Sequence, residues 1–322
     1  MINKIRRASS ATALTILLLS MPISSHSAPT KRPDLPPQAQ IHVAPFRIIR
    51  IEYEGLTALA QAHYTTVDDP ANHETSDFPG VAKLILDLLI DGEVGSVGCT
   101  GTLLLGGMHV LTAAHCVSDE AGNDILQSGV ATFTNSGAEE AINIDSITIH
   151  PNWDGNFIKG DDIAILTLTS QASMTGYDID RNSKDDIQSI GDKVGFGLSG
   201  MGTPEDTLTL EFGTKRNGQN KYDATADTML KALGLRSGRD FVRGAVLQYD
   251  FDNGEDAHDA FKFFFGIPGL GLGDDEVSSA PGDSGGPTIK GGIIQGVTSY
   301  GTRRNGSKLL DTRISFVVVE NF

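Results

Sequence analysis

From about Val67 onward, the chain is a succession of short apolar or alternating segments separated by Gly, Asn and Asp. In Leu208–Phe212 apolar and polar residues alternate, which is the period of a half-buried strand. The other segments of this kind are Ala82–Ile90, Ile142–Ile149, Ile163–Leu168 and Ile293–Ser299. Only Ala226–Leu235 has the pattern of a helix. Glycine accounts for 37 of the 322 residues, above the roughly 7% average, so we predict an all-β fold of barrels or a sandwich.

The first 27 residues have the order of a secretory signal peptide. Basic residues precede the apolar stretch Ala11–Ile23, and small residues follow it. The stretch is too short to span a membrane, and cleavage after Ser27 fits best because a cut one residue later would leave Pro29 beyond the scissile bond. We therefore expect a secreted or periplasmic protein without stable membrane insertion. Residues 28–66, which begin rich in proline, are predicted to be a pro-segment or linker, and 67–322 the folded domain.

Charge and cysteine content narrow the classes of partner. With a net charge of -16 the chain would repel the negatively charged phosphate backbone of a nucleic acid, so we expect no nucleic acid partner. In an oxidising compartment the lone pair Cys99 and Cys116 predicts a disulfide, with two free buried thiols as the alternative. A zinc site is disfavoured, because no second cysteine pair or spaced histidine pair accompanies them.

Three segments carry residues of the types that peptide-bond hydrolysis needs: Leu111–Cys116, Asp161–Leu166 and Gly282–Pro287. A serine hydroxyl is a weak nucleophile until an imidazole takes its proton, and the imidazole needs a carboxylate to fix its tautomer. The developing oxyanion needs backbone N–H donors, which glycine-rich turns can aim. Gly282 and Ser284 can supply that pair of donors.

The sequences Thr-Ala-Ala-His-Cys, Asp-Ile-Ala-Ile-Leu and Gly-Asp-Ser-Gly-Gly-Pro resemble those of the trypsin/chymotrypsin-like serine proteases, over residues 67–322. The resemblance implies two packed six-stranded antiparallel β-barrels with the active site in the cleft between them. It also implies a serine endopeptidase that acts on polypeptides through an acyl-enzyme and needs no cofactor. His115 then corresponds to the general base, Asp162 to the residue that orients it, and Ser284 to the nucleophile. Asp161 is the alternative for the acid role, but in the family the Asp directly precedes the Ile-Ala pair, as Asp162 does here.

Three alternatives compete with this interpretation. Gly282-x-Ser284-x-Gly286 also matches the nucleophile elbow of α/β-hydrolases, but their histidine follows the serine and none follows Ser284 here. The glycine pattern of residues 195–200 matches a dinucleotide fingerprint, but Met-Gly-Thr-Pro follows where a helix should begin. A catalytically inactive, protease-like binding protein is the alternative function, and the intact His-Asp-Ser set disfavours it.

The resemblance also implies residues for substrate binding. Ser278, six residues before the nucleophile, corresponds to the base of the primary specificity pocket and predicts an uncharged pocket, which Leu309 would shorten. The nearby acidic residues 274–276 leave a displaced acidic pocket open as an alternative. Ser299, Tyr300 and Gly301 resemble the strand that pairs with the substrate backbone.

Activation of the family requires a new N-terminal amine that pairs with the Asp beside the nucleophile, here Asp283. Val67 is the best candidate for that terminus, although the residues after it lack the usual Gly-Gly. We therefore expect a zymogen and an activating protease. The acidic run Asp250–Asp256 fails the EF-hand pattern, because Gly254 comes one place early and Phe261 takes the position of the bidentate Glu. We interpret it as a solvated turn, with calcium binding as the alternative. We interpret the phenylalanines at 261 and 263–265 as core, with an exposed substrate patch as the alternative.

Overall fold

The computed structural model describes part of the 322-residue chain. The described residues are 42–43, 51–53, 56–59, 64–66, 69–181, 187–201, 212–232, 236–238, 241–252, 254, 256, 259–304 and 313–318. The predicted signal peptide, Val67, most of the predicted strand 208–212 and Leu309 lie outside them. No helix within these ranges is long and apolar enough to cross a membrane.

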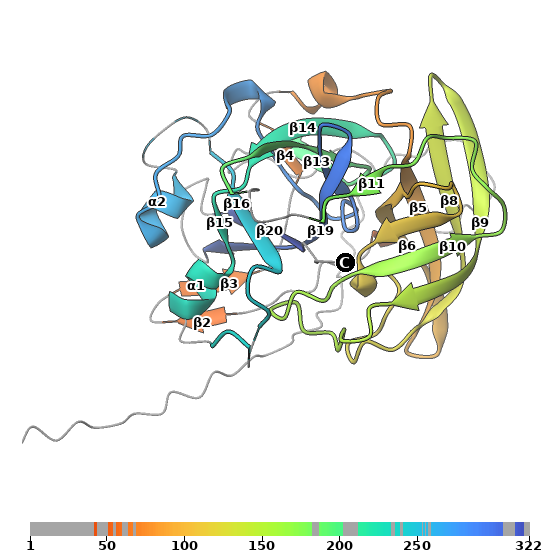
Figure 1. Ribbon diagram of the computed structural model, residues 1–322, viewed down its shortest axis with the longest axis horizontal. Coiled ribbons are helices and arrows are strands. Elements are labelled where there is room, and N and C mark those ends of the chain that lie inside the picture. Colours follow the sequence, from red (N-terminus) through yellow and green to blue (C-terminus); the bar gives the residue numbers. More distant parts are fainter. Residues whose placement is uncertain are drawn as a thin grey trace, which may run out of the picture.

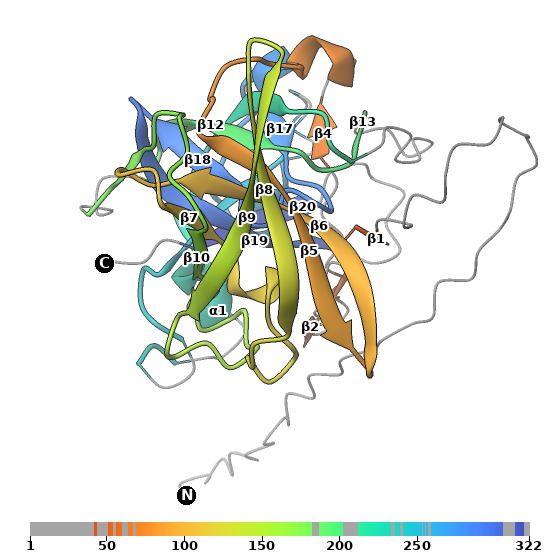
Figure 2. The same ribbon diagram turned by 90° about the vertical axis from the view of Figure 1, so that its right-hand side faces the viewer.

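Six consecutive antiparallel strands form the first barrel, on the right in Figure 1 and facing the viewer in Figure 2. They are β5 (Val81–Ile90), β6 (Glu93–Leu103), β7 (His109–Thr112), β8 (Leu126–Asn135), β9 (Ala138–Ile149) and β10 (Ala164–Leu168). The order is β6-β5-β8-β9-β10-β7, and β7 pairs back with β6, which closes the barrel. Along β5 buried positions alternate with half-buried ones, which places Leu84 and Leu86 in the core.

The second barrel has the same construction. Its strands are β12 (Ile190–Gly195), β14 (Arg216–Lys221), β15 (Ala224–Thr225), β16 (Val246–Asp250), β18 (Pro287–Lys290), β19 (Ile293–Arg304) and β20 (Arg313–Val318). They pair antiparallel in the order β14-β12-β18-β19-β20-β16-β15. Only two residues separate β14 from β15, and between them Asp223 N–H donates to Gln248 O at 2.9 Å. The run β14–β15 therefore acts as one strand that closes the barrel, and the all-β, two-barrel prediction is confirmed.

Residues of the predicted pro-segment or linker contribute short strands to this body. Strand β1 (His42–Val43) runs parallel to β6, and β3 (Leu56–Leu59) pairs with β19 and with β2 (Ile51–Tyr53). Strand β4 (Tyr64–Thr66) lies between β13 (Ser199–Met201) and β17 (Val277–Ser278) in a small third sheet. A further short strand, β11 (Asp178–Ile179), pairs with β19. In this structure the segment before residue 67 is thus joined to both barrels by backbone pairing.

Two α-helices and three 3-10 turns complete the described elements. Helix α1 (Asp227–Ala232) falls inside the predicted 226–235. Helix α2 (Ala260–Phe265) was not predicted, since its phenylalanines were assigned only to the core; of these, Phe261 is buried. The 3-10 turns are η1 (Pro70–His73), η2 (Ala114–Cys116) and η4 (Gly273–Asp275). Figure 1 shows α1 and α2 on the side of the second barrel away from the first.

Candidate active site

His115, Asp162 and Ser284 meet at the junction of the two barrels. His115 Nε2 lies 2.8 Å from Ser284 Oγ, and His115 Nδ1 lies 2.7 Å from Asp162 Oδ2. With the proton on Nδ1, facing the carboxylate, Nε2 is free to accept the hydroxyl proton of Ser284. The serine is therefore placed for activation by an oriented imidazole.

The three side chains come from turns that follow or precede barrel strands. His115 lies in η2, immediately after β7, and the Cys99–Cys116 disulfide ties this turn to β6. The predicted disulfide is thus confirmed. Asp162 lies two residues before β10, and Ser284 lies in the turn before β18. The first barrel thus holds the predicted base and acid, and the second holds the predicted nucleophile.

Asp162 is wholly buried and accepts hydrogen bonds through both carboxylate oxygens. Besides the imidazole, the backbone N–H of His115 donates to Oδ1 at 2.8 Å and Ser299 Oγ donates to Oδ2 at 2.5 Å. The neighbouring Asp161 instead lies 3.6 Å from the Nδ1 of His150. Of the two adjacent carboxylates, the one preferred from the sequence is the one that contacts His115.

The turn that carries Ser284 is fixed against β6 by Thr100. Thr100 N–H donates to Ser284 O at 2.9 Å, and its buried hydroxyl donates to Gly282 O at 2.8 Å. The same hydroxyl accepts from Phe196 N–H at 3.1 Å. One side chain of the first barrel therefore holds two separate loops of the second.

The backbone amides of Gly282 and Ser284 have the freedom that an oxyanion site requires. Among the described residues, neither N–H donates to a protein acceptor. Gly282 has φ of 97°, and a Cβ there would lie 2.7 Å from the Phe212 ring, so both backbone and space require glycine. The Phe212 ring therefore lies directly against the Gly282 backbone.

Asp283, beside the predicted nucleophile, points away from the triad of His115, Asp162 and Ser284. Its carboxylate accepts from Gly197 N–H and from Ala280 N–H, both at 2.8 Å. Burial raises the pKa of Asp283 to about 7, although the two amides and the charge of Arg216 act in the opposite direction. A cation beside this carboxylate would relieve the cost of its burial. Val67, the candidate for that cation, lies outside the described residues.

The predicted substrate-binding residues lie on both sides of the nucleophile turn. Ser278 is buried in β17, where it is paired with Thr65 of β4. Tyr300 and Gly301 lie in β19 and pair with β20, after an irregularity of register that involves Ser299. Ser299 therefore contacts Asp162 with its side chain, while the two residues after it continue the ladder.

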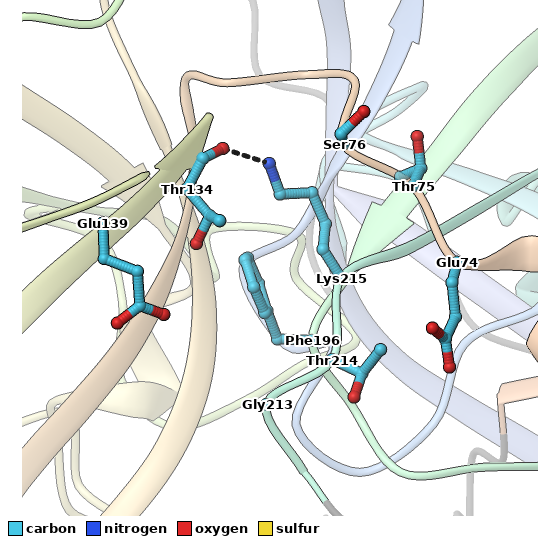
Figure 3. A pocket seen from close by; sticks show the side chains of 9 residues that line it. All are labelled: Glu74, Thr75, Ser76, Thr134, Glu139, Phe196, Gly213, Thr214 and Lys215. Carbon is cyan, nitrogen blue, oxygen red and sulfur yellow. Dashed lines mark hydrogen bonds between the residues drawn. The ribbon is translucent and has the colours of Figure 1, made fainter. Parts of the chain in front are cut away.

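A pocket of about 350 Å³ lies apart from the triad and contains none of the predicted catalytic residues. Its lining residues are Glu74, Thr75, Ser76, Thr134, Glu139, Phe196, Gly213, Thr214 and Lys215. Figure 3 shows the Lys215 amine directed at Thr134 O, which it meets at 3.0 Å. The amine also donates to Asp77 O at 3.1 Å and Phe78 O at 3.2 Å, and burial lowers its pKa to about 8. This lysine thus bridges the approach to β14 and the first barrel.

Comparison with known proteins identifies the family. The Trypsin family model matches residues 79–244, more than half of the 322-residue chain. The chain belongs to the trypsin family. The match of this trypsin-family chain includes His115 and Asp162 and ends before Ser284.

The trypsin-family relatives share modest identity with this chain. Chymotrypsin-like elastase family member 1 of Bos taurus is 35% identical over 80 residues, which cover 24% of this chain and 30% of that protein. The chain therefore aligns with about a third of such relatives. The chymotrypsin-like serine proteinase of Haliotis rufescens is 26% identical over 210 residues, 62% of this chain and 69% of that protein. The solved structure of neuropsin, described as a serine protease expressed in mouse brain, has a TM-score of 0.48 at 18% identity and covers 80% of this chain and 93% of its own.

Two contributors to this trypsin-family site were missed from the sequence. Thr100 was not singled out, although it follows Cys99, and a disulfide to Cys116 beside His115 necessarily brings β6 to the site. Phe157, whose ring centroid lies 5.3 Å from that of His115 and 5.6 Å from that of Tyr300, carries no motif that could have marked it. Ser299 was assigned to substrate binding, and its hydrogen bond to Asp162 was not expected.

Proposed function

We propose that the chain is an exported serine endopeptidase that hydrolyses polypeptides through an acyl-enzyme. The observation that carries the proposal is the continuous hydrogen-bonded series Ser284–His115–Asp162, with distances of 2.8 Å and 2.7 Å. Family membership supports it, and the disulfide agrees with export into an oxidising compartment. The intact series favours a protease over the inactive, protease-like binding protein.

In the proposed reaction Ser284 Oγ attacks the carbonyl carbon of the scissile peptide while its proton passes to His115 Nε2. Asp162 stays ionised and stabilises the imidazolium. The carbonyl oxygen becomes an oxyanion, to which the N–H groups of Gly282 and Ser284 donate. Its collapse expels the amine, which takes the proton from His115 and leaves an acyl ester on Ser284. Water, deprotonated by His115, then hydrolyses the ester and regenerates the serine.

Burial of the site supports the further proposal that the chain is made as a zymogen. Ser284 has no exposed surface and the His115 side chain retains 4%. A substrate carbonyl cannot approach an atom without exposed surface, so the state described must open before it can act. The Phe212 ring against Gly282 and the raised pKa of Asp283 agree with a site that lacks its activating amine. An activating protease that cuts before Val67 would supply that amine.

Substrate preference is proposed from the base of the specificity pocket. A neutral Ser278 favours uncharged residues before the scissile bond, since it offers no charge to pair with lysine or arginine. The backbone of residues 299–301 is proposed to receive the substrate as an added strand. Faster cleavage after Arg than after Leu or Ala in a peptide-library profile would exclude the uncharged pocket.

A fluorophosphonate probe, which reacts covalently with activated serines, tests the proposal. The full chain is treated before and after limited proteolysis, and the labelled residue is located by peptide mapping, with Ser284→Ala as the control. We expect labelling of Ser284 after proteolysis only, together with a new N-terminus at Val67. Labelling without proteolysis would refute the zymogen and leave the protease standing. Absence of labelling in both forms would refute the protease and favour the binding protein.

A further inference from the structure

Three carboxylates outside the triad meet between the end of β16 and the start of α2. Asp250 ends β16, Asp252 follows it, and Asp259 precedes α2 as its N-cap. One oxygen from each lies within 4.8 Å of the other two. All three residues are buried, with 4%, 2% and 2% of their surface exposed. The interpretation of this run as a solvated turn is therefore wrong for Asp250 and Asp252, because both residues are buried in the cluster with Asp259.

The hydrogen bonds of the cluster leave one oxygen unpartnered. Asp250 Oδ2 accepts from Phe261 N–H at 2.8 Å. Asp259 accepts from Lys262 N–H at 2.7 Å and from Gly269 N–H at 2.9 Å. Asp252 Oδ1 is fully buried and has no hydrogen-bond partner in the described part of the chain. A buried carboxylate oxygen without a donor is costly, unless a cation takes the donor's place.

A fourth carboxylate, that of Glu276, lies beside the cluster and accepts hydrogen bonds from backbone amides. Glu276, almost fully buried, accepts from Asp252 N–H at 2.7 Å and from Leu272 N–H.

Nearby lysines do not neutralise the cluster. Lys221 Nζ lies 3.3 Å from Asp223 Oδ1, so its charge is directed at a different carboxylate. Lys193 lies 4.0 Å from the ring centroids of both Tyr222 and Tyr249, and burial lowers its pKa well below the usual value. The negative charge of the three aspartates therefore has no matching positive side chain against it among the described residues.

We propose that Asp250, Asp252 and Asp259 bind one Ca²⁺ ion. Ca²⁺ takes oxygen ligands at about 2.3–2.6 Å, so two ligands of one ion lie at most about 5 Å apart. The three aspartate oxygens, which all lie within 4.8 Å of one another, satisfy this limit. The donor set is all carboxylate, which suits hard cations and not zinc or copper. Ca²⁺ is preferred to Mg²⁺ because it tolerates irregular coordination and loses its waters more readily, as a buried site demands.

The bound ion would tie together the chain between β16 and β17. Asp250 belongs to the barrel, Asp259 begins α2, and Glu276 directly precedes β17, whose Ser278 is the proposed base of the specificity pocket. The ion is thus a structural crosslink within this segment. The ion takes no part in the proposed hydrolysis, so the proposal of a Ca²⁺ site does not depend on the proposed function.

Calorimetric titration of the full chain with CaCl₂ tests the site. The chain carries Ser284→Ala against self-digestion and is freed of cations with a chelator. We expect one Ca²⁺ per chain, bound at least about tenfold more weakly by Asp252→Asn, a loss of about 1.4 kcal/mol. The control is Asp145→Asn, which removes an exposed carboxylate in β9 of the first barrel and is expected to leave binding unchanged.

Thermal unfolding provides a second readout, with opposite signs in the two conditions. In chelator, Asp252→Asn is expected to melt higher than the parent, because the ion-free parent must bury the Asp252 carboxyl group beside two others, either charged or at the cost of taking up a proton, and the amide avoids both costs. In excess CaCl₂ the parent gains stability by mass action and the variant gains less, so the order is reversed.

Several results would overturn the proposal. They are absence of Ca²⁺ binding, binding that Asp252→Asn leaves at full strength, and equal affinity for Mg²⁺. If Asp252→Asn does not fold, Asp259→Asn is titrated in its place with the same expected loss. None of these measurements depends on proteolytic activity, so a failure here is distinct from failure of the probe experiment.

Discussion

Thr100 offers a sharp test of how the nucleophile turn is held, because two substitutions separate its hydroxyl from its volume. Thr100→Val keeps the shape and removes the hydroxyl that donates to Gly282 O and accepts from Phe196 N–H. Thr100→Ser keeps the hydroxyl and removes one methyl group. All three residues involved are buried, so the valine leaves a carbonyl and an amide without partners and without access to water.

The magnitude follows from those two groups. A buried polar group left unpaired costs about 1–3 kcal/mol, and local relaxation recovers part of it, so we expect Thr100→Val to lower the free energy of unfolding by about 2–4 kcal/mol. The loss of one methyl in Thr100→Ser costs about 1 kcal/mol. The variant of unchanged volume is thus expected to be the less stable of the two.

Urea denaturation of the full chain, again with Ser284→Ala, measures both free energies. The midpoint is followed by tryptophan fluorescence, and the slope is required to be the same in all variants. If Thr100→Val is as stable as Thr100→Ser, the hydroxyl does not hold the turn and the reasoning is refuted.

Two further predictions concern residues beside the triad. The pKa of Asp283 is about 7 in the folded chain and about 4 when unfolded. The folded state therefore binds more protons between these values, and stability falls as pH rises from about 4 to 7. Urea midpoints should vary less with pH in Asp283→Asn than in the parent, and an equal variation would contradict the raised pKa. Ser299→Ala removes the donor to Asp162, and in activated enzyme we expect kcat to fall about tenfold or more, since charged hydrogen bonds contribute about 1.5–3 kcal/mol, with KM little changed. Ser96→Ala, which removes a similar 2.5 Å bond to an aspartate in the first barrel, is the control, and an equal loss of kcat in both would exclude a specific role for Ser299.

The contact among His115, Asp162 and Ser284 was predictable because each residue lies in a short motif whose chemistry depends on neighbouring residues. His115, Asp162 and Ser284 lie far apart along the chain, but the backbone around each is set by local glycines, alanines and the strand that follows. The two-barrel fold followed from the same resemblance, since composition alone left a sandwich open. Asp162 could be separated from Asp161 for a local reason, because it directly precedes the Ile-Ala pair that leads into β10.

The aspartate cluster was not predictable in the same way. Charged residues are exposed in most folds, and Asp250 and Asp252 lie in a run of polar residues that has the composition of a surface turn. Their burial depends on where α2 packs, and six residues rich in phenylalanine have too short a pattern to separate a helix from a core strand. Ser299 shows the same limit, because its contact with Asp162 joins residues 137 positions apart.

Lys215 bears on how the two barrels unfold. Its amine meets the carbonyls of Asp77, Phe78 and Thr134, all contributed by the first barrel or its approach, while its backbone leads into the second. Separation of the barrels would break all three hydrogen bonds at once and leave the charged amine and the three carbonyls without these partners. Neither barrel can therefore be expected to melt alone while the other persists. The described body should lose its structure in one cooperative transition, and a fragment that holds only the first barrel should not be stable on its own.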